Sequence, residues 1–336
     1  MAGPVGIRDV AERARISVGT VSNVLNKPEI VAKATRQRVL AVIDELGFVR
    51  NDLARQLKMG GGTTLGMIVL SVANPFFADL AHACEAAAEQ CGYTVVLGSS
   101  DGMRGREDHY MDLFEEQRVR GMMVAPFDGA TDRMRQMRNR GMHMVLFDSL
   151  ADESDFCTVA LDGAAGGALA ARHLIETGRR RIAFVAGASH LLEDRWTGAQ
   201  RACAEHQNVR LERLDSAGQT VAAGHAAGTR LAALPASERP DAVFAGNDQL
   251  AIGLMHALVL ADDVDVPRDI AIMGYDDIDY AASAIIPLTT IRQPTHAIAR
   301  EAIRLIVDES ANLDHAHESV RLVPELVVRE STPALG

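Results

Sequence analysis

The feature that most constrains the fold is an alternation of short apolar segments with longer helical ones, which runs twice along residues 65–290. In the first run, LGMIVLS, TVVLGSS, GMMVAP and HMVLFD alternate with segments such as FFADLAHACEAAAEQCG and REDHYMDLFEEQ. In the second, RRRIAFVAG, VRLERL, DAVFAGNDQ and DIAIMGYDD alternate with segments such as LAARHLIETG and LAIGLMHALVLA. This alternation is typical of βαβ units and a parallel sheet. Two consecutive runs predict an α/β core of two doubly wound lobes around a cleft.

A different pattern precedes the core. The helix expected after Ser17, a potential N-cap, has one apolar side and one short, uncharged polar side. The apolar side holds Val21, Val24 and Leu25, and the polar side holds Thr20, Asn23 and Asn26. Helical patterns before and after it predict a trio of helices, the last of which stops at Gly47. Two short helices joined by a tight turn and backed by a third predict an all-α helix-turn-helix domain; a three-helix domain with a merely solvated polar stripe is the alternative.

The charge distribution is uneven. The whole chain has 34 Lys or Arg and 45 Asp or Glu, a net charge of −11. Residues 1–60 hold ten basic and six acidic residues, a net charge of +4, so the remaining residues carry −15. A basic head on an acidic body concentrates the attraction for phosphate at one end of the chain.

The bulk composition indicates a soluble protein. Apolar residues make up 48% of the 336 residues and charged residues 24%, and neither a membrane span nor a signal-peptide core stands out. The four cysteines, Cys84, Cys91, Cys157 and Cys203, form no CxxC pair and have no histidine close in sequence. Cys84 and Cys91 are seven apart on an apolar helical face. The pattern therefore predicts buried, reduced thiols, no metal site and a cytoplasmic protein.

Several stretches together resemble one known family. IRDVAERARISVGTVSNVLN, TRQRVLAVIDELGF and NDLARQL, with PLTTIRQP and LVPELVVREST later, are similar to the LacI/GalR (lactose-repressor) family of bacterial transcription regulators. The resemblance implies a periplasmic-binding-protein-like core in which the chain crosses between lobes near Leu161, Thr290 and Arg321. The implied domains are a head over 1–50, a hinge helix and linker over 51–63, a first lobe over 64–160 with 291–320, and a second lobe over 161–290 with 321–332.

The resemblance also implies which residues contact DNA. They are Ser17, Val18, Gly19, Thr20, Ser22, Asn23 and Asn26 in the head, and Ala54 and Leu57 in the hinge. Val18 and Gly19 match positions that reach base edges, although Val18 shares a face with Val21 and could instead belong to the core. Thr20 and Asn26 match positions that contact phosphate. Leu57 matches a leucine that wedges into the central base step, with packing on a neighbouring helix as the alternative. Two residues depart from the family, Arg50 at a usual proline and Ala32 at a usual serine cap.

Polar residues at the carboxyl ends of strands indicate a ligand site. Asp148, Asn247 and Asp276 each follow a predicted strand, and Arg195 follows IAFVAG. By resemblance these four match effector-contacting positions, and Phe77 matches an aromatic lining the pocket. Gln219 matches a position where purine-binding relatives carry an aromatic, which favours a sugar. Asp248, the residue after Asn247, is interpreted as structural.

The sequence thus predicts a dimeric, effector-controlled transcription regulator, most plainly a repressor, that binds palindromic double-stranded operator DNA. We expect a small-molecule effector, most simply a sugar, and no membrane association, cofactor or C-terminal tetramerisation helix. The alternatives are a sugar-binding module of the transport type, a purine-responsive regulator of the same fold, and an enzyme on an α/β scaffold. No HExxH, P-loop or GxGxxG motif supports the enzyme.

Overall fold

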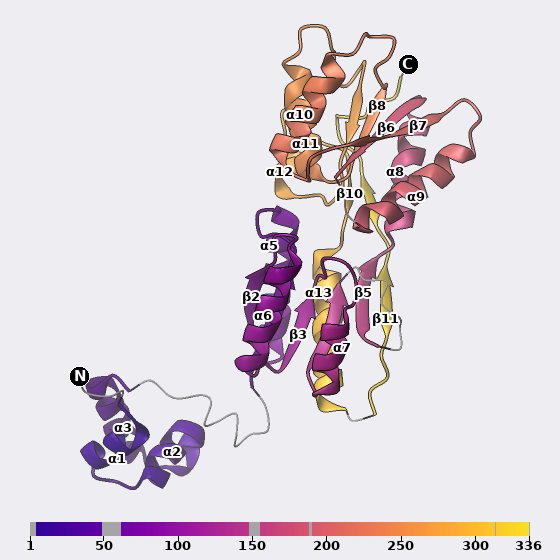
Figure 1. The fold of residues 1–336 in the computed structure, drawn as a ribbon. Coiled ribbons are helices and arrows are strands. Elements are labelled where there is room, and N and C mark those ends of the chain that lie inside the picture. The colour runs from indigo at the N-terminus through magenta and orange to yellow at the C-terminus, as the bar shows by residue number, and fades with distance from the viewer. Residues whose placement is uncertain (1–4, 49–61, 148–154, 188–189, 313, 336) are drawn as a thin grey trace. The chain divides into compact units, whose positions relative to one another are not determined.

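The computed structural model describes residues 5–48, 62–147, 155–187, 190–312 and 314–335 (Figure 1). Contacts within the chain divide it into two units, Met1–Gly62 and Thr63–Gly336. Every helix in these described ranges is too short or too polar to cross a membrane.

The first unit, called the head below, is a bundle of three α-helices. These are α1 (Ile7–Ala14), α2 (Val18–Asn26) and α3 (Lys33–Leu46), with a short 3-10 helix at Pro28–Ile30. Arg15 ends α1 in the left-handed conformation (φ 54°), and Gly47 ends α3 in the same way (φ 61°). One apolar core joins the three helices through Val10, Ala11, Ala14, Val21, Val24, Val39 and Val42. The predicted helix-turn-helix domain is confirmed.

The first lobe of the second unit is built on a six-stranded parallel sheet with the order β11-β5-β4-β3-β1-β2. Its strands are β1 (Thr64–Val69), β2 (Thr94–Ser99), β3 (Gly121–Val124), β4 (His143–Phe147), β5 (Cys157–Leu161) and β11 (Ser319–Leu322). Alternate side chains point to opposite faces. Met67 therefore packs under α5 (Pro75–Gln90) and α13 (Thr295–Ala311), while Ile68 packs under α6 (Arg104–Glu116) and α7 (Asp132–Asn139).

The second lobe has a four-stranded parallel sheet with the order β7-β6-β8-β9. Its strands are β6 (Arg181–Ala186), β7 (Arg210–Asp215), β8 (Ala242–Ala245) and β9 (Ala271–Met273). Phe184 and Phe244 pack under α8 (Gly163–Glu176) and α9 (His190–Ala204). Val185 and Val243 pack on the opposite face, under α10 (Val221–Ala232) and α11 (Asp248–Val259), and a short α12 spans Asp279–Ala282. Helices on both faces of each sheet confirm the predicted architecture.

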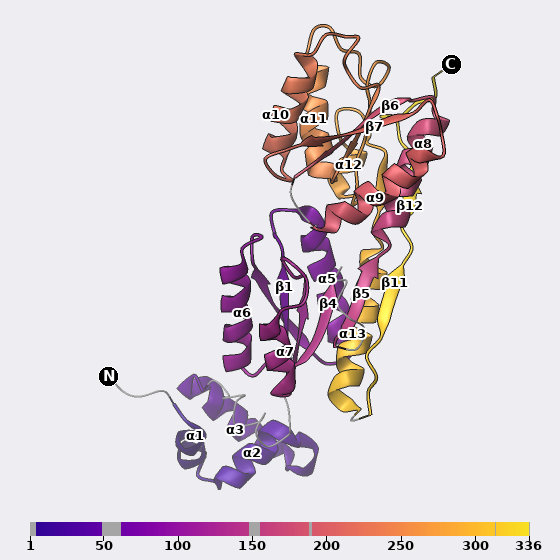
Figure 2. The same cartoon turned by 45° about the vertical axis from the view of Figure 1, so that its right-hand side comes forward.

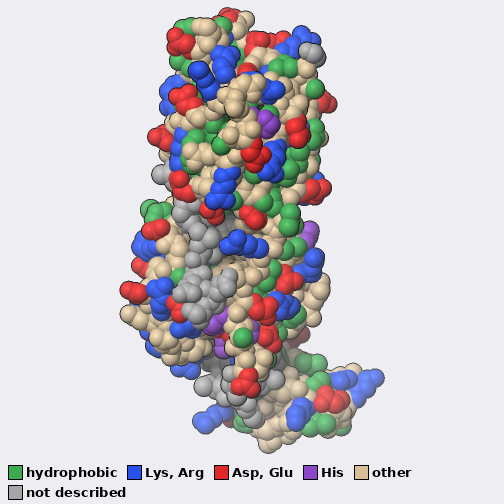
Figure 3. All heavy atoms as spheres, turned by 90° about the vertical axis from the view of Figure 1, so that its right-hand side faces the viewer, with side chains coloured by type: hydrophobic (Ala, Val, Ile, Leu, Met, Phe, Trp, Pro, Cys, Tyr) green, Lys and Arg blue, Asp and Glu red, His purple; other side chains and the backbone are tan. Residues whose placement is uncertain are grey.

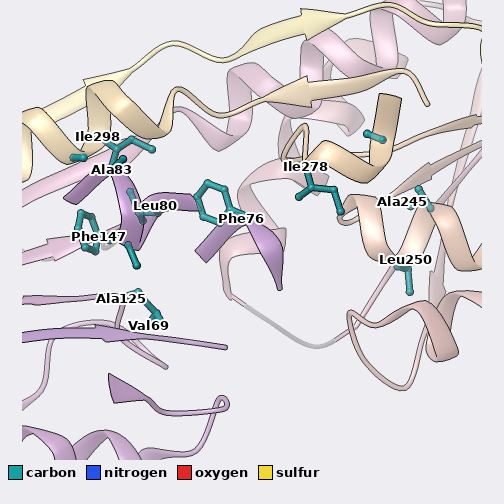
Figure 4. Close-up of a cluster of buried hydrophobic side chains, with 14 of the residues drawn as sticks. Val69, Phe76, Leu80, Ala83, Ala125, Phe147, Ala245, Leu250, Ile278 and Ile298 are labelled. Atoms are coloured by element: carbon teal, nitrogen blue, oxygen red, sulfur yellow. The ribbon is translucent and has the colours of Figure 1, made fainter. Parts of the chain in front are cut away.

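Three connections join the lobes, as Figure 2 shows. The chain leaves the first sheet at Leu161 and enters α8, leaves β10 (Thr290–Arg292) and enters α13, and leaves β11 and enters β12 (Glu325–Val327). β10 and β12 form an antiparallel pair. Apolar side chains from both lobes belong to one continuous cluster, and Figure 4 shows members from α5, such as Phe76 and Leu80, and from α11, such as Leu250.

The surface of the second unit carries both signs of charge. Figure 3 shows acidic and basic side chains interspersed over one of its faces. Many are paired, for example Arg304 with Glu301 and Glu318, each at 2.8 Å. Pairing leaves the excess of acidic residues in this unit unchanged, so the basic head remains the part of the chain that attracts phosphate.

The four cysteines are free thiols, but they are not all buried. Cys84, Cys157 and Cys203 are buried, as predicted, whereas Cys91 is exposed. The prediction for Cys91 is wrong because α5 ends at Gln90, so Cys91 is its C-cap and no longer follows the apolar face that contains Cys84.

Candidate functional site

One part of the candidate site is α2 of the head. Ser17 caps this helix, because its Oγ accepts a hydrogen bond from the backbone amide of Thr20 at 3.0 Å. The two hydroxyl oxygens of Ser17 and Thr20 also lie 2.9 Å apart. A side-chain acceptor at this position satisfies one of the free amides of the first turn. The predicted N-cap is confirmed, and it fixes the point at which the helix begins.

The outward side of α2 carries small, neutral groups. Val18 is 42% exposed and lies outside the apolar core, so the alternative that it is a core residue is wrong. Gly19 and Asn23 are exposed as well. In the last turn, Asn26 Nδ2 donates to the carbonyl oxygen of Ser22 at 2.8 Å. The helix thus presents the methyl groups of Val18, exposed backbone at Gly19 and the amide groups of Asn23 and Asn26, all of which suit contact with DNA.

Three predicted site residues lie outside the residues that the structure describes. Ala54 and Leu57 lie within residues 49–61, after α3, and Asp148 follows β4. Their predicted roles stay predictions.

The other part of the candidate site is a cavity of about 140 Å³ between the lobes of the second unit. It is lined by Leu70, Asn74, Phe76, Phe77, Leu192, Arg195, Gln219, Gly246, Asn247, Asp276 and Gln293. The structure therefore brings together five of the six predicted effector residues. A cavity of about 150 Å³ holds a molecule the size of benzene, so this one suits a single-ring molecule.

Asp276 lies in the turn after β9 and is surrounded by polar partners. Its Oδ1 accepts a hydrogen bond from Gln293 Nε2 at 2.7 Å, and its Oδ2 lies 3.4 Å from Asn74 Nδ2 in the first lobe. Its φ of 118° is in a region that residues other than glycine rarely adopt. Strained backbone of this kind persists where surrounding contacts over-determine it, often at ligand sites. Here the contacts with Gln293 and Asn74 accompany a strained backbone that places the Asp276 carboxylate in the cavity wall.

Arg195 on α9 lies beside this carboxylate. Its Nη2 is 3.9 Å from Asp276 Oδ1, and its Nη1 donates to the carbonyl oxygen of Gly246 at 2.5 Å. The guanidinium carbon lies 3.6 Å from the ring centre of Tyr275. Gly167 on α8 permits this placement, since a Cβ there would lie 1.9 Å from the Arg195 carbonyl oxygen. Close packing of α8 on α9 thus fixes the backbone that carries the guanidinium.

Gln219 presents polar atoms with no partner. Both its amide atoms are buried and make no hydrogen bond to any residue that the structure describes. Asn247 holds its backbone: Asn247 Nδ2 donates to the Gln219 carbonyl oxygen at 3.1 Å, while Oδ1 caps α11 at the Leu250 amide at 2.9 Å. Gln293 Oε1 is another buried atom without a partner in the described ranges. Leaving such groups unsatisfied costs roughly 1–3 kcal/mol each, so a ligand that bonds to them is favoured.

Asp248 does not line the cavity, but its hydrogen bonds hold the segments that do. Its Oδ2 accepts from the Ile278 amide at 2.9 Å and its Oδ1 from the Thr290 hydroxyl at 2.6 Å. Burial, together with the nearby carboxylate of Asp276, raises the pKa of Asp248 well above its usual range. The structural role predicted for Asp248 is confirmed, because it ties the turn containing Asp276 to β10.

Sequence reasoning missed two polar residues of the cavity, Asn74 and Gln293. Asn74 follows β1 directly before Pro75, a helix-start signal that marks it as the cap of α5. That position at the carboxyl end of a strand could have indicated a site residue, as it did for Asn247. Gln293 follows β10, within a segment assigned only to a connection between lobes.

Comparison with known proteins gives matches over the whole chain. Residues 6–51 match the bacterial regulatory proteins of the lacI family, and residues 171–332 match a periplasmic binding protein-like domain. The chain is 34% identical to the HTH-type transcriptional repressor PurR of Photobacterium profundum, over 98% of this chain and 99% of the relative. It is similar to the lac repressor dimer bound to operator and the anti-inducer ONPF, with 25% identity, a TM-score of 0.82 and coverage of 99% of this chain and 100% of that one. It is also similar to a transcriptional regulator CelR–cellobiose complex, with 29% identity, a TM-score of 0.70 and coverage of 97% and 99%.

Proposed function

Because the chain belongs to the LacI family of bacterial regulatory proteins, it is a DNA-binding transcriptional regulator controlled by an effector, and we propose that a sugar is this effector. The observation that carries the proposal is the pair of buried amide atoms of Gln219 in the cavity wall, which have no hydrogen-bond partner among the described residues. A molecule that offers both donors and acceptors satisfies them, and the hydroxyl groups of a sugar do so.

The remaining lining fits the same ligand. Asp276 supplies carboxyl oxygens as acceptors and Arg195 a donor, while Phe77 supplies an aromatic surface for the apolar side of a sugar ring. Hydrogen bonds to charged groups contribute about 1.5–3 kcal/mol each. By resemblance, Gln219 stands where purine-binding relatives carry an aromatic side chain, so a stacking surface for a nucleobase is missing there. The cellobiose bound to the related CelR regulator supports a sugar as the class of ligand.

A purine-responsive regulator is the second candidate. It is favoured by one observation, the name PurR of the curated relatives, which are 31–34% identical to this chain. A planar base can also use the Gln219 amide and lie against Phe76 or Phe77, which both line the cavity. We rank the sugar first because several hydrogen-bonding side chains line the cavity and because, by resemblance, purine-binding relatives carry an aromatic residue in place of Gln219.

The DNA-binding part of the proposal uses the outward side of α2. We assign DNA contacts to Ser17, Val18, Gly19, Thr20, Ser22, Asn23 and Asn26, with Ala54 and Leu57 in the hinge. One recognition helix reads only a few base pairs, so a homodimer on a palindromic operator is expected. Binding weakens steeply with salt, because phosphate contacts release counterions.

The effector acts by binding one arrangement of the lobes better than another. Phe77 comes from the first lobe, whereas Arg195, Gln219 and Asp276 come from the second. A ligand that contacts both lobes favours their closed arrangement, and only such differential affinity shifts the equilibrium. A coupling of typically 1–3 kcal/mol between effector and operator follows.

Calorimetric titration of the full-length protein with monosaccharides, disaccharides and nucleobases tests the ligand class. We expect saturable binding of at least one sugar, abolished in Gln219→Leu, which keeps the size of the side chain and removes its amide. Operator binding, followed by fluorescence anisotropy, then changes in the presence of that sugar. Binding of purines alone, unaffected by Gln219→Leu, would replace the proposal by the second candidate.

A further inference from the structure

Four metal-ligating side chains converge in the first lobe, away from the effector cavity. Cys157 begins β5, Glu309 lies in the last turn of α13, and His315 and His317 lie between α13 and β11. Their sulfur, carboxylate oxygen and imidazole nitrogens all lie within 4.8 Å of one another. Cys157 is at the amino end of its strand, and the cavity is reached from the carboxyl ends, so the cluster and the cavity occupy opposite edges of the sheet.

The spacing of the donor atoms suits a tetrahedral ion. Cys157 Sγ lies 3.1 Å from His315 Nε2 and 3.7 Å from His317 Nδ1. Zinc bonds of about 2.3 Å to sulfur and about 2.0 Å to nitrogen, at tetrahedral angles, place sulfur and nitrogen about 3.5 Å apart. The two imidazole rings are nearly perpendicular, at 75°, with centres 5.6 Å apart. Small shifts of the side chains would therefore bring the donors into coordination.

The outer groups orient the donors as in established zinc sites. Asp308 Oδ2 lies 2.6 Å from His315 Nδ1, so the opposite nitrogen, Nε2, faces Cys157. A carboxylate that holds the second ring nitrogen of a ligating histidine fixes its tautomer and orientation. Glu309 is also held, because its Oε2 accepts from the Met144 amide at 3.3 Å.

The cluster is largely buried, and its charge matches that of a divalent ion. Cys157 is fully buried, and the side chains of His315 and Glu309 are 5% and 10% exposed. A thiolate and a carboxylate together neutralise a dication, and the imidazoles are neutral ligands. The thiolate is the form that binds a metal, so binding of the ion displaces the Cys157 proton.

We propose that Cys157, Glu309, His315 and His317 bind one Zn²⁺ ion. Four protein ligands leave no position open for water, which is typical of structural and not catalytic zinc. The ion would tie β5 to the end of α13 and the start of β11. Two of these elements, β5 and β11, lead directly into connections between the lobes. The alternative is a metal-free cluster of hydrogen-bonded Cys and His side chains.

Cobalt substitution tests the site directly. The full-length protein, produced without a polyhistidine tag, is treated with a chelator and titrated with Co²⁺. We expect one equivalent to bind, with visible bands of tetrahedral cobalt and a sulfur-to-cobalt charge-transfer band in the near ultraviolet. One equivalent of Zn²⁺ should displace the cobalt, and it should raise the Tm of the chelated protein.

Matched variants locate the ion. Cys157→Ser should abolish the charge-transfer band, whereas Cys203→Ser, which alters another buried thiol, and Cys91→Ser, which removes the exposed one, should retain it. Asp308→Asn should weaken metal affinity by about 10- to 100-fold, as outer-ligand changes do, whereas the exposed Asp314→Asn should not. His317→Gln, on a half-buried side chain, provides a second ligand variant if circular dichroism shows that Cys157→Ser is misfolded. Absence of a stoichiometric tetrahedral spectrum, or a Co²⁺ affinity that is unchanged in both His317→Gln and Asp308→Asn, would overturn the proposal.

Discussion

Asn74 Nδ2 in the first lobe lies 3.4 Å from Asp276 Oδ2 in the second, so a contact between lobes uses the same carboxylate that lines the effector cavity. Gln249 Nε2 makes a second contact between the lobes, to the Ala73 carbonyl oxygen at 3.0 Å. An effector that bonds to Asp276 therefore changes the balance between open and closed lobes at the point where they meet. Ligand binding and lobe closure cannot be separated at this residue.

Removing that carboxylate should uncouple the effector from DNA. We expect Asp276→Ala to weaken effector binding by about 10- to 100-fold, because charged hydrogen bonds contribute about 1.5–3 kcal/mol each. Operator binding, measured by anisotropy, should then no longer respond to the effector at concentrations that saturate the wild type. Asp279→Ala, an exposed carboxylate on α12, is the control. Unchanged effector affinity and an unchanged response would remove Asp276 from the site.

The contact between lobes can be changed without changing the cavity carboxylate. Asn74 Oδ1 caps α5 at the Phe76 amide, at 3.1 Å. Asn74→Asp keeps this cap, since aspartate caps helices as well as asparagine. It also places a second carboxylate opposite that of Asp276, across the contact between the lobes. We expect little change in Tm and a weaker effector affinity, because like charges disfavour the closed arrangement. Asn74→Ser keeps a cap and adds no charge, so its effector affinity should lie between those of Asn74→Asp and the wild type. Equal affinities of the three proteins would show that the contact does not contribute to closure.

A change in base preference tests α2. Asn23→Arg should shift the preferred base at one symmetric operator position from adenine toward guanine. An amide matches the donor and acceptor of adenine, and a guanidinium matches the two acceptors of guanine. Selection from a randomised operator library measures the shift. Asn26→Ala, at an expected phosphate contact, should instead weaken all operators alike. If Asn23→Arg leaves the preference unchanged, Asn23 contacts phosphate.

The close approach of backbone to DNA is tested at Gly19. A Cβ there would meet only Ser17 Oγ, at an ordinary 3.6 Å, and alanine is favoured over glycine in a helix by up to about 1 kcal/mol. Gly19→Ala should therefore leave the head folded, with an equal or higher Tm, while operator affinity falls about tenfold or more. Gly105→Ala, at an open position in α6, is the matched control and should not affect DNA binding. Full operator affinity in Gly19→Ala would show that the backbone at Gly19 stays clear of the DNA.

Much of this architecture can be predicted because its signals are local. The cap at Ser17 and the stop at Gly47 depend on neighbours a few residues away. The alternation of strands and helices likewise indicates which residues end strands, and Asn247 and Asp276 were found in that way. Helical periodicity gave a wrong prediction for Cys91, because a spacing of seven from Cys84 does not indicate where the helix ends.

The rest depends on contacts distant in sequence. His315 is 158 residues from Cys157, a separation that no spacing rule for metal ligands covers. The prediction of no metal site therefore considered only potential ligands that lie close together in the sequence. The Gln219 amide is a similar case, because its lack of a hydrogen-bond partner among the described residues can be recognised only once the surrounding fold is known.

The reactivity of the thiols gives a last prediction, which separates Cys91 from the others. The thiolate is the reactive form, and burial raises the pKa of Cys84 to about 12 and those of Cys157 and Cys203 to about 11. At pH 8 the thiolate fractions of these three are therefore about one in a thousand or less, and burial further limits access to them. Chelator-treated native protein should show one fast-reacting thiol, and denatured protein should show four, the total in the sequence.

The pH dependence of this labelling has a definite sign. Between pH 8 and pH 10, any slow labelling of the native protein at the buried thiols should rise about tenfold per pH unit, since each pKa lies above this range. Cys91→Ser should abolish the fast phase, and Cys84→Ser should leave it intact. A fast phase that survives in Cys91→Ser would mean that one of the three buried cysteines becomes exposed by opening of the native protein.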